Sequence, residues 1–306
     1  MATIKTTWSL LPRQFKLLSA LLVATFLATS GVTPAQASFG GSLLSDNSFS
    51  VGYTFTQAGI DQVCSGVLVS PIIIASAAHC TVDAKGNKSS NYIFAAPGTA
   101  LDAPLNPAVR RPQVVKIFSS TGDIVFFQLD IPLATKGMIR VATSAEVTAL
   151  TTNSEVMGYG FGKVPETQML YSPLVRRYPL MWNADHDESN TLLITSKTAT
   201  ACVGDSGGAI TARLPSGEEV LVAVMKGAAS VVDGCATQVN GLYTMMVTAV
   251  HPYLDLITEI LATPVTVPSP SASPVPKKTK ILCMKGKVKK YVYAINPKCP
   301  KGYKKV

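Results

Sequence analysis

Short apolar runs separated by turn residues make up most of the chain. The runs are bounded by clusters such as Ser-Pro, Lys-Gly-Asn and Thr-Gly-Asp, which are typical of turns. Strands are predicted at residues 63–69, 72–77, 114–118, 124–129, 155–159, 192–195, 209–212, 220–225 and 241–244. Many short strands without alternating helices predict an all-β fold, either a barrel or a sandwich.

One amphipathic helix is predicted, at residues 248–261, with a proline in its first turn, where the missing N–H costs little. The composition then changes. Residues 263–280 are rich in Pro and Ser and predict an extended linker, and residues 281–306 form a short Lys-rich tail. The main domain is therefore expected at residues 38–262, with strand-rich halves at about 38–145 and 146–247.

Composition supports a folded chain, because 47% of the residues are apolar and only 15% are charged. The net charge of +9 suggests an acidic partner when it is taken for the whole chain. The charge is uneven, however. Residues 277–306 hold 11 Lys and no acid, residues 1–37 hold three basic residues and no acid, and the stretch between them carries −5. The positive charge therefore belongs to the two ends.

Residues 1–37 have the features of a signal peptide. Basic residues precede an apolar run at residues 17–28, and Ala35-Gln36-Ala37 supplies a small-x-small cleavage pattern. The apolar run is short for a membrane span, which needs about 20 residues. The mature protein is expected to be secreted or extracytoplasmic.

Six cysteines follow the expected cleavage point, and an even number in an exported chain predicts three disulfides. They are Cys64, Cys80, Cys202, Cys235, Cys283 and Cys299. Sequence alone allows 15 connectivities. Pairing of nearest neighbours, which places one bridge in each third of the mature chain, is favoured. The chain has no C-x-x-C pair, so a metal site is not expected.

Three motifs carry candidate chemistry: Ala77-Ala78-His79-Cys80, Thr121-Gly122-Asp123, and Cys202-Val203-Gly204-Asp205-Ser206-Gly207-Gly208. A serine hydroxyl is a weak nucleophile and needs an adjacent base, for which histidine has a suitable pKa. A carboxylate orients such a histidine, and Asp123 begins an apolar strand that would bury it. Glycines beside the serine allow a sharp turn whose N–H groups point at a developing oxyanion. The motifs predict nucleophilic acyl transfer.

The motifs resemble those of the chymotrypsin/trypsin-like serine proteases, also in their chain order His, Asp, Ser. The resemblance covers residue 38 to about residue 261. It implies two antiparallel six-stranded β-barrels with a C-terminal helix and an active site between the barrels. It further implies an endopeptidase with Ser206 as nucleophile, His79 as general base and acid, and Asp123 as orienting carboxylate. The N–H groups of Gly204 and Ser206 would form the oxyanion hole.

The resemblance also implies roles for two disulfides and a substrate pocket. Cys64–Cys80 would brace the histidine turn, and Cys202–Cys235 would brace the pocket wall. The pocket would have Thr200 at its base and Gly227 and Gly241 on its walls. Because Thr200 carries no charge, specificity for Arg or Lys is not expected.

Two positions bear on specificity and activation. Where family members usually carry Ser-Trp-Gly, this chain has Met225-Lys226-Gly227, so Lys226 would favour an acidic or polar substrate residue.

In the family a new N-terminal amine pairs with the Asp before the nucleophile, here Asp205. Ser38 directly follows the cleavage pattern and lies 26 positions before Cys64, so signal peptidase alone would expose the pairing amine. Serine, however, is a polar first residue that would not bury well in an apolar site. The alternative to pairing with this amine is that internal hydrogen bonds hold Asp205.

Two other functions stay open. A protease-like fold can be retained for binding without catalysis. Gly204-x-Ser206-x-Gly208 also matches the nucleophile elbow of α/β-hydrolase esterases, which needs a following helix and β-α alternation. Protein or peptide substrates are expected, with no cofactor, no metal, no nucleic acid and a monomeric chain. The Lys-rich tail would attach to an anionic cell-envelope surface or would only solubilise the chain.

Overall fold

The structure is a computed structural model of the chain and describes residues 41–102, 110–119, 122–133, 137–164, 170–186, 190–263, 279–294 and 297–306. The expected signal peptide, Ser38 and most of the expected linker lie outside these residues. The chain separates into two units, Met1–Ile260 and Leu261–Val306. Among the described residues, no helix has the length and apolar character that crossing a membrane requires.

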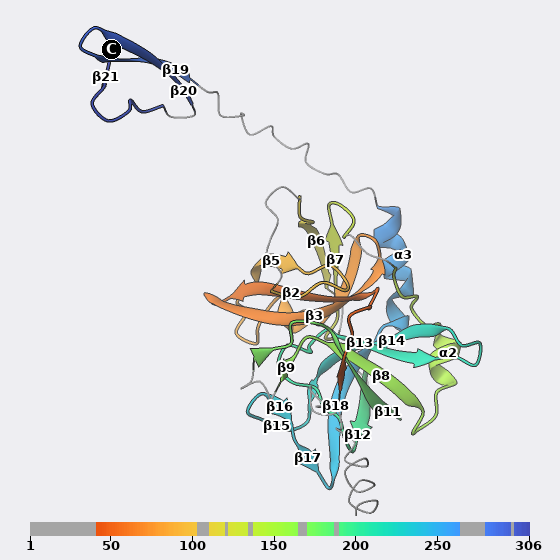
Figure 1. Ribbon diagram of the computed structural model, residues 1–306. Helices are drawn as coiled ribbons and strands as arrows, with labels where there is room; N and C mark the ends of the chain where they lie inside the picture. Colours follow the sequence, from red (N-terminus) through yellow and green to blue (C-terminus); the bar gives the residue numbers. More distant parts are fainter. Residues whose placement is uncertain are drawn as a thin grey trace, which may run out of the picture. The chain divides into compact units, whose positions relative to one another are not determined.

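The first half of the larger unit is a six-stranded antiparallel sheet (Figure 1). Its order is β5 (Ser90–Phe94), β2 (Ser50–Gln57), β3 (Ile60–Ser70), β4 (Ile73–Ser76), β7 (Val125–Leu129) and β6 (Val114–Ser119). A two-residue turn joins β2 to β3, and both its residues, Ala58 and Gly59, have positive φ (51° and 79°). This is the geometry of a tight hairpin whose twist matches its strands.

The second half is a closed six-stranded barrel. Its strands are β8 (Glu155–Gly160), β11 (Arg176–His186), β12 (Thr191–Ser196), β18 (Leu242–Ala249), β14 (Glu219–Ala228) and β13 (Ala209–Arg213), and pairing of β11 with β8 closes the circle. Short strands extend it: β1 (Ser42–Leu43) pairs with β11, and β17 (Gln238–Val239) pairs with β18. Two small ribbons complete this half, β9 (Lys163–Val164) with β10 (Leu170–Tyr171) and β15 (Val231–Val232) with β16 (Cys235–Ala236).

The all-β prediction is confirmed, with two differences of detail. Within the described residues, β5 and β6 end the first sheet without pairing with each other, so this half is an open half-barrel beside a closed barrel. The C-terminal helix begins later than residue 248, because β18 continues to Ala249. A 3-10 turn at His251–Tyr253 leads into α3 (Leu254–Ala262).

A shared core fixes the two halves against each other. Phe126 of the half-barrel and Tyr159 of the barrel belong to one buried cluster, which also contains Ile257 and Ile260 of α3. The short helix α2 (Ser144–Thr148) lies between the two halves in sequence and begins with a capping box of Thr143 and Glu146. The apolar contacts hold the two sheets in a fixed relation, which an active site between them requires.

The smaller unit contains a three-stranded sheet, in the order β20 (Val288–Ala294), β19 (Thr279–Lys285) and β21 (Lys304–Lys305). The chain carries the three disulfides of the nearest-neighbour pairing: Cys64–Cys80 and Cys202–Cys235 in the larger unit and Cys283–Cys299 in the smaller. No cysteine is free among the described residues.

Two of these disulfides make a matched pair, because each spans a sequence separation of 16 residues but they lie in different units. We expect replacement of Cys64 and Cys80 by Ala to lower the free energy of unfolding of the larger unit by about 3 kcal/mol, the loop-closure value. Trp182 is buried in this unit and is the one tryptophan after residue 37, so its fluorescence during guanidinium unfolding measures the change.

The control replaces Cys283 and Cys299 by Ala. This change is expected to leave the Trp182 transition where it is in the wild type. Equal shifts from both double substitutions would contradict the division of the chain into two units.

Candidate active site

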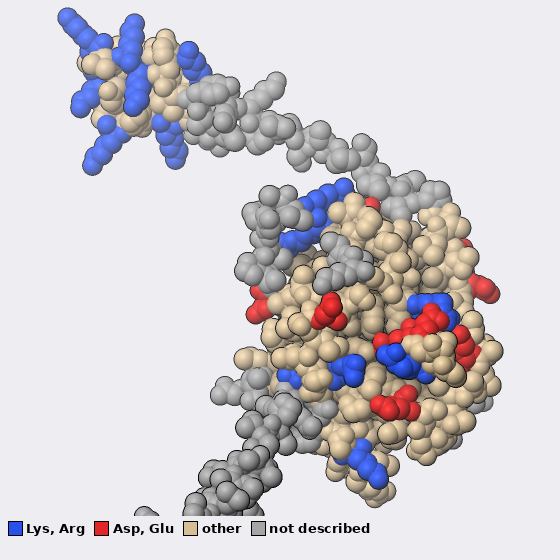
Figure 2. Space-filling view, turned by 45° about the vertical axis from the view of Figure 1, so that its right-hand side comes forward, with Lys and Arg blue, Asp and Glu red and all other residues tan. Residues whose placement is uncertain are grey.

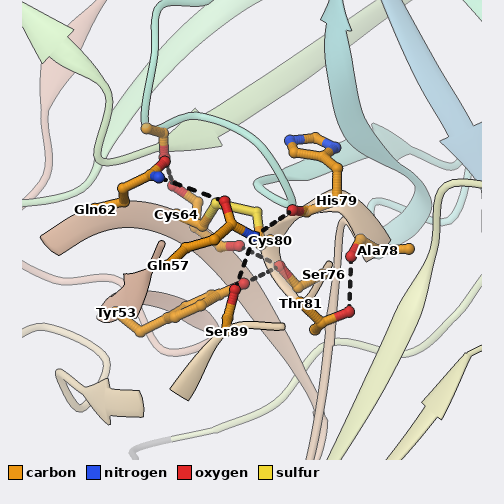
Figure 3. Close-up of a disulfide and its surroundings, with 12 residues drawn as sticks. Tyr53, Gln57, Gln62, Cys64, Ser76, Ala78, His79, Cys80, Thr81 and Ser89 are labelled. Atoms are coloured by element: carbon orange, nitrogen blue, oxygen red, sulfur yellow. Dashed lines mark hydrogen bonds between the residues drawn. A yellow bond between two sulfur atoms is a disulfide. The ribbon is translucent and has the colours of Figure 1, made fainter. Parts of the chain in front are cut away.

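His79 lies on a 3-10 turn, Ala78–Cys80, that directly follows β4. The disulfide from Cys80 to Cys64 on β3 anchors the turn to the sheet, as Figure 3 shows. The Thr81 hydroxyl donates a hydrogen bond to the Ala78 carbonyl (2.7 Å), and the Gln57 amide donates to the His79 carbonyl (3.4 Å). The backbone of the histidine is therefore fixed from several sides while its side chain stays 43% exposed.

Asp123 holds the imidazole through two hydrogen bonds. Its Oδ2 lies 2.7 Å from His79 Nδ1, and its Oδ1 accepts the His79 backbone N–H at 2.9 Å. Burial raises the pKa of Asp123, but the hydrogen bonds and charge of His79, with a smaller contribution from Lys226, hold it below its ordinary value. The carboxylate is therefore ionised at neutral pH, and it orients the ring so that Nε2 is available for proton transfer.

The loop that carries Ser206 packs against the strands that lead to His79. Gly204 and Gly207 have positive φ (104° and 81°), so the chain turns sharply on both sides of the serine. A Cβ at Gly207 would overlap the Ser76 hydroxyl and lie 2.8 Å from the backbone nitrogen of Ala77. The structure thus brings the serine loop beside the histidine turn. No hydrogen bond joins Ser206 Oγ to the His79 ring in the described part of the chain.

The backbone N–H groups of Gly204 and Ser206 are unengaged: neither donates a hydrogen bond to any residue that the structure describes. Their neighbours in the loop are all engaged, since Asp205 donates to the Cys202 carbonyl (3.0 Å) and Gly207 to the Met225 carbonyl (2.7 Å). Two available N–H groups beside a serine hydroxyl match the donors that stabilise an oxyanion.

Asp205 is fully buried behind the serine. Its Oδ1 accepts the Gly162 N–H and its Oδ2 accepts the Cys202 N–H, both at 2.8 Å. Burial raises the pKa of Asp205 to about 6, although the two hydrogen bonds and the charge of buried Arg176 oppose that rise. Glycine is required around the carboxylate, because a Cβ at Gly162 would lie 2.5 Å from Asp205 Cγ. Each carboxylate oxygen of Asp205 thus has an internal hydrogen bond, whether or not an N-terminal amine pairs with it.

Ser65 is a site residue that the sequence patterns do not predict. Its backbone N–H donates to the Ser206 carbonyl (2.8 Å), its hydroxyl donates to the Gly204 carbonyl (2.8 Å), and the Phe161 N–H donates to that hydroxyl (2.9 Å). This buried serine on β3 therefore ties the half-barrel to the serine loop of the barrel. Its position next to Cys64 is the one sequence signal that could have drawn attention to it.

The expected specificity residues occupy the barrel. Thr200 is buried, and its hydroxyl donates to the Ala201 carbonyl (3.3 Å). Gly227 lies on β14, and Gly241 precedes β18 with a φ of 77°. A Cβ at Gly241 would meet no atom within 4 Å, and one at Gly227 would meet only the Met246 methyl at 3.8 Å. Both glycine positions thus have open space beside them. That they line one pocket together with Thr200 stays a prediction.

A cleft of about 620 Å³ opens beside the His79–Asp123 pair and is also lined by Lys226, Thr81 and Asp83. Lys226 donates one hydrogen bond to the Thr191 hydroxyl (2.9 Å), and an ammonium group has three donors. The cleft therefore has a cation within its walls next to the candidate catalytic groups.

The one group of potential metal ligands in the described residues is Cys64, His79 and Cys80, whose ligand atoms lie within 4.8 Å of one another. Both sulfur atoms belong to the disulfide and provide no thiolate. The group therefore does not have the chemistry of a metal site.

A half-barrel and a barrel with a His–Asp pair on one and a glycine-flanked serine on the other define a trypsin-like protein. A family model described as Trypsin matches residues 39–257, and the chain belongs to this family. This membership supports a serine protease hydrolase as the general class, and the fold and disulfides agree with an extracellular or secreted protein. A search of curated proteins found no match to the chain.

Proposed function

We propose that the chain is an exported serine endopeptidase that hydrolyses peptide bonds through an acyl-enzyme on Ser206. The observation that carries the proposal is the 2.7 Å contact between His79 Nδ1 and Asp123, on a turn against which the Ser206 loop packs. In this mechanism His79 takes the proton of the Ser206 hydroxyl as Oγ attacks the substrate carbonyl. It then gives that proton to the leaving amine.

The same residues serve the second half of the reaction, in which water hydrolyses the acyl-enzyme. The oxyanion of each tetrahedral intermediate is held by the unengaged N–H groups of Gly204 and Ser206. Water, deprotonated by His79, releases the acyl group and restores the free serine. Asp123 stabilises the imidazolium in both steps and remains ionised.

Of the two alternatives, the α/β-hydrolase esterase conflicts with the fold. That class needs a helix directly after the nucleophile and a largely parallel sheet. Here Ser206 is followed by β13, which pairs antiparallel with β14 and β8. A non-catalytic binding protein is the competing interpretation that experiment must separate from the protease.

We expect Ser206→Ala to lower cleavage of a peptide library by about 10⁴-fold or more, because the substitution removes the nucleophile and leaves only binding and oxyanion stabilisation. The measurement is the cleavage rate of the mature chain, with Thr211→Ser as a control at a buried hydroxyl of β13. Cleavage by the wild type that persists in Ser206→Ala would assign the activity to another group or to a contaminant.

We further propose that Asp205 pairs with the amine of Ser38 once residues 1–37 are removed. Strand β1 supports this, because Ser42 pairs with Arg177 and Leu43 with Arg176, whose charge acts on the Asp205 carboxylate. Ser42, which follows Ser38 by four positions in the sequence, thus lies beside the strand that carries Arg176. An ammonium partner would offset the burial cost of the carboxylate and lower its pKa from about 6.

N-terminal sequencing of the secreted active protein is expected to begin at Ser38. A variant that begins one residue earlier, with Ala37 retained, is expected to be far less active, because its amine lies one residue farther along the chain. An active protein that begins well after Ser38 would exclude this pairing.

We propose that Lys226 gives the cleft a preference for an acidic substrate residue near the scissile bond. Lys226 lines the cleft with His79 and Asp123, its charge acts on Asp123, and its ammonium group keeps donors beyond the one used for Thr191. An acidic substrate side chain would meet this cation, whereas the uncharged Thr200 offers no attraction for a basic one.

Lys226→Gln is expected to lower kcat/KM for peptides with an acidic residue at the preferred position by about 5-fold, the effect of roughly 1 kcal/mol for a partly exposed ion pair. Peptides with the matching amide residue should change little. Lys116→Gln, which removes an equal charge at exposed β6, is the control. Equal losses for acidic and amide peptides would contradict a role for Lys226 in specificity.

A further inference from the structure

The smaller unit presents a dense set of positive charges and contains no acidic side chain. All nine lysines among its described residues are exposed: Lys280, Lys285, Lys287, Lys289, Lys290, Lys298, Lys301, Lys304 and Lys305. Residues 277–306 contain no Asp or Glu, so no carboxylate side chain of the unit neutralises them. Figure 2 shows Lys side chains projecting from this unit in several directions.

Strand register divides four of these lysines into two pairs on opposite faces of the sheet. Lys290 and Lys305 both pair with Cys283, so they lie on either side of it. Lys289 and Lys304 both pair with the next residue, Met284. Successive residues of a strand point to opposite faces, so each face has one lysine pair. Two strand spacings separate the members of a pair, which is about 10 Å.

About 10 Å slightly exceeds the screening length of about 8 Å in physiological salt, so the repulsion within each pair is weak there and grows as the salt concentration falls. The unit has little apolar core, because Cys283 is its one fully buried side chain in the described residues. The disulfide from Cys283 to Cys299 closes this small fold covalently. The lysines thus lie close together in the folded unit before any partner binds, and an anionic chain can contact several of them at once.

Two features indicate the class of partner: the positive charge comes from lysine alone, and it lies on both faces of the sheet. Residues 277–306 contain lysine and no arginine, and lysine binds phosphate as a point charge without the fixed two-bond geometry of arginine. A planar membrane would contact one face and leave the other lysine pair unused. A flexible chain of anionic groups can follow both faces and the strand edges.

We propose that the smaller unit binds a flexible phosphate-bearing polymer of the cell envelope and so holds the larger unit where that polymer is present. The binding is electrostatic, uses both faces of the sheet and requires no defined sequence of polymer units. It involves none of the residues of the candidate active site, so it stands apart from the proposed proteolysis.

The test uses the full mature chain with Ser206→Ala in every variant, so that self-cleavage does not interfere. Binding to immobilised long-chain inorganic polyphosphate is measured at several salt concentrations. One variant removes the charges of one face (Lys289→Gln with Lys304→Gln), and a second removes those of the other (Lys290→Gln with Lys305→Gln). Matched variants carry Arg at the same positions, and mass spectrometry verifies the Cys283–Cys299 disulfide in each.

We expect the wild type to bind polyphosphate and not neutral dextran, with log K falling linearly as log salt rises. Each Lys→Gln face variant should lose affinity, and the slope of that line should fall in magnitude by about 1.5, the value for two lost contacts. The Lys→Arg variants should bind within about 3-fold of the wild type, since they keep the charge.

Three results would overturn the proposal. The first is undiminished binding by both Lys→Gln face variants. The second is loss from one face variant alone, which indicates a planar partner. The third is retention of the wild type on vesicles with 30% phosphatidylglycerol but not on polyphosphate, which assigns the surface to a membrane.

Discussion

The buried carboxylate of Asp205 is the group around which the serine loop is arranged. A carboxylate without solvent is costly unless its oxygens are hydrogen bonded, and here the Gly162 and Cys202 N–H groups each donate to one oxygen. Meeting that requirement fixes the residue directly before Ser206 and draws Gly162 against it. The nearby charge of Arg176 further offsets the cost. The two hydrogen bonds therefore restrict the backbone of the loop at the residue before Ser206.

The second requirement is that groups from two separate sheets meet at a fixed distance. In the proposed mechanism the half-barrel contributes His79 and Asp123, and the barrel contributes Ser206. Ser65 connects them, since its hydrogen bonds reach the Gly204 and Ser206 carbonyls and the Phe161 N–H. A shared apolar cluster that includes α3 supports the same contact from behind. The two sheets thus support the proposed chemistry of the site, while the cleft beside it is lined by Lys226 of β14 and by residues around His79 and Asp123.

Many of the strands and the turn at Ser206 can be predicted from the sequence, because short stretches of neighbouring residues determine them. Apolar runs locate nine strands, and the glycine-flanked serine predicts a sharp turn. The located strands are β3, β4, β6, β7, β8, β12, β13, β14 and the start of β18. Strand β11 is not predicted, because Pro179 and two arginines interrupt its alternation, although Tyr178, Leu180 and Trp182 are buried in the barrel. Hydrogen bonds to both β8 and β12 stabilise β11 as a strand. Pairing between strands that are distant in the sequence cannot be recognised from the residues of β11 alone.

In the candidate site, likewise, short motifs predict some residues, whereas others depend on contacts between distant parts of the sequence. The motifs single out His79, Asp123 and Ser206, but the role of Ser65 depends on contacts across 139 and 96 residues of sequence. The position of Lys226 in the cleft likewise depends on how β14 lies against the half-barrel. Helix α2 is a case in which a readable signal, the capping box at Thr143 and Glu146, was present in a segment too short for helical periodicity.

The proposed protease depends on activation of Ser206 by the His79–Asp123 pair, and covalent labelling measures that activation. The mature chain is exposed to a fluorophosphonate, and the adduct is located by peptide mass spectrometry. We expect one adduct, on Ser206, and a rate of labelling that falls by orders of magnitude in His79→Ala, because the hydroxyl then lacks its base. No adduct on the wild type, or equal labelling rates for the wild type and His79→Ala, would contradict this activation.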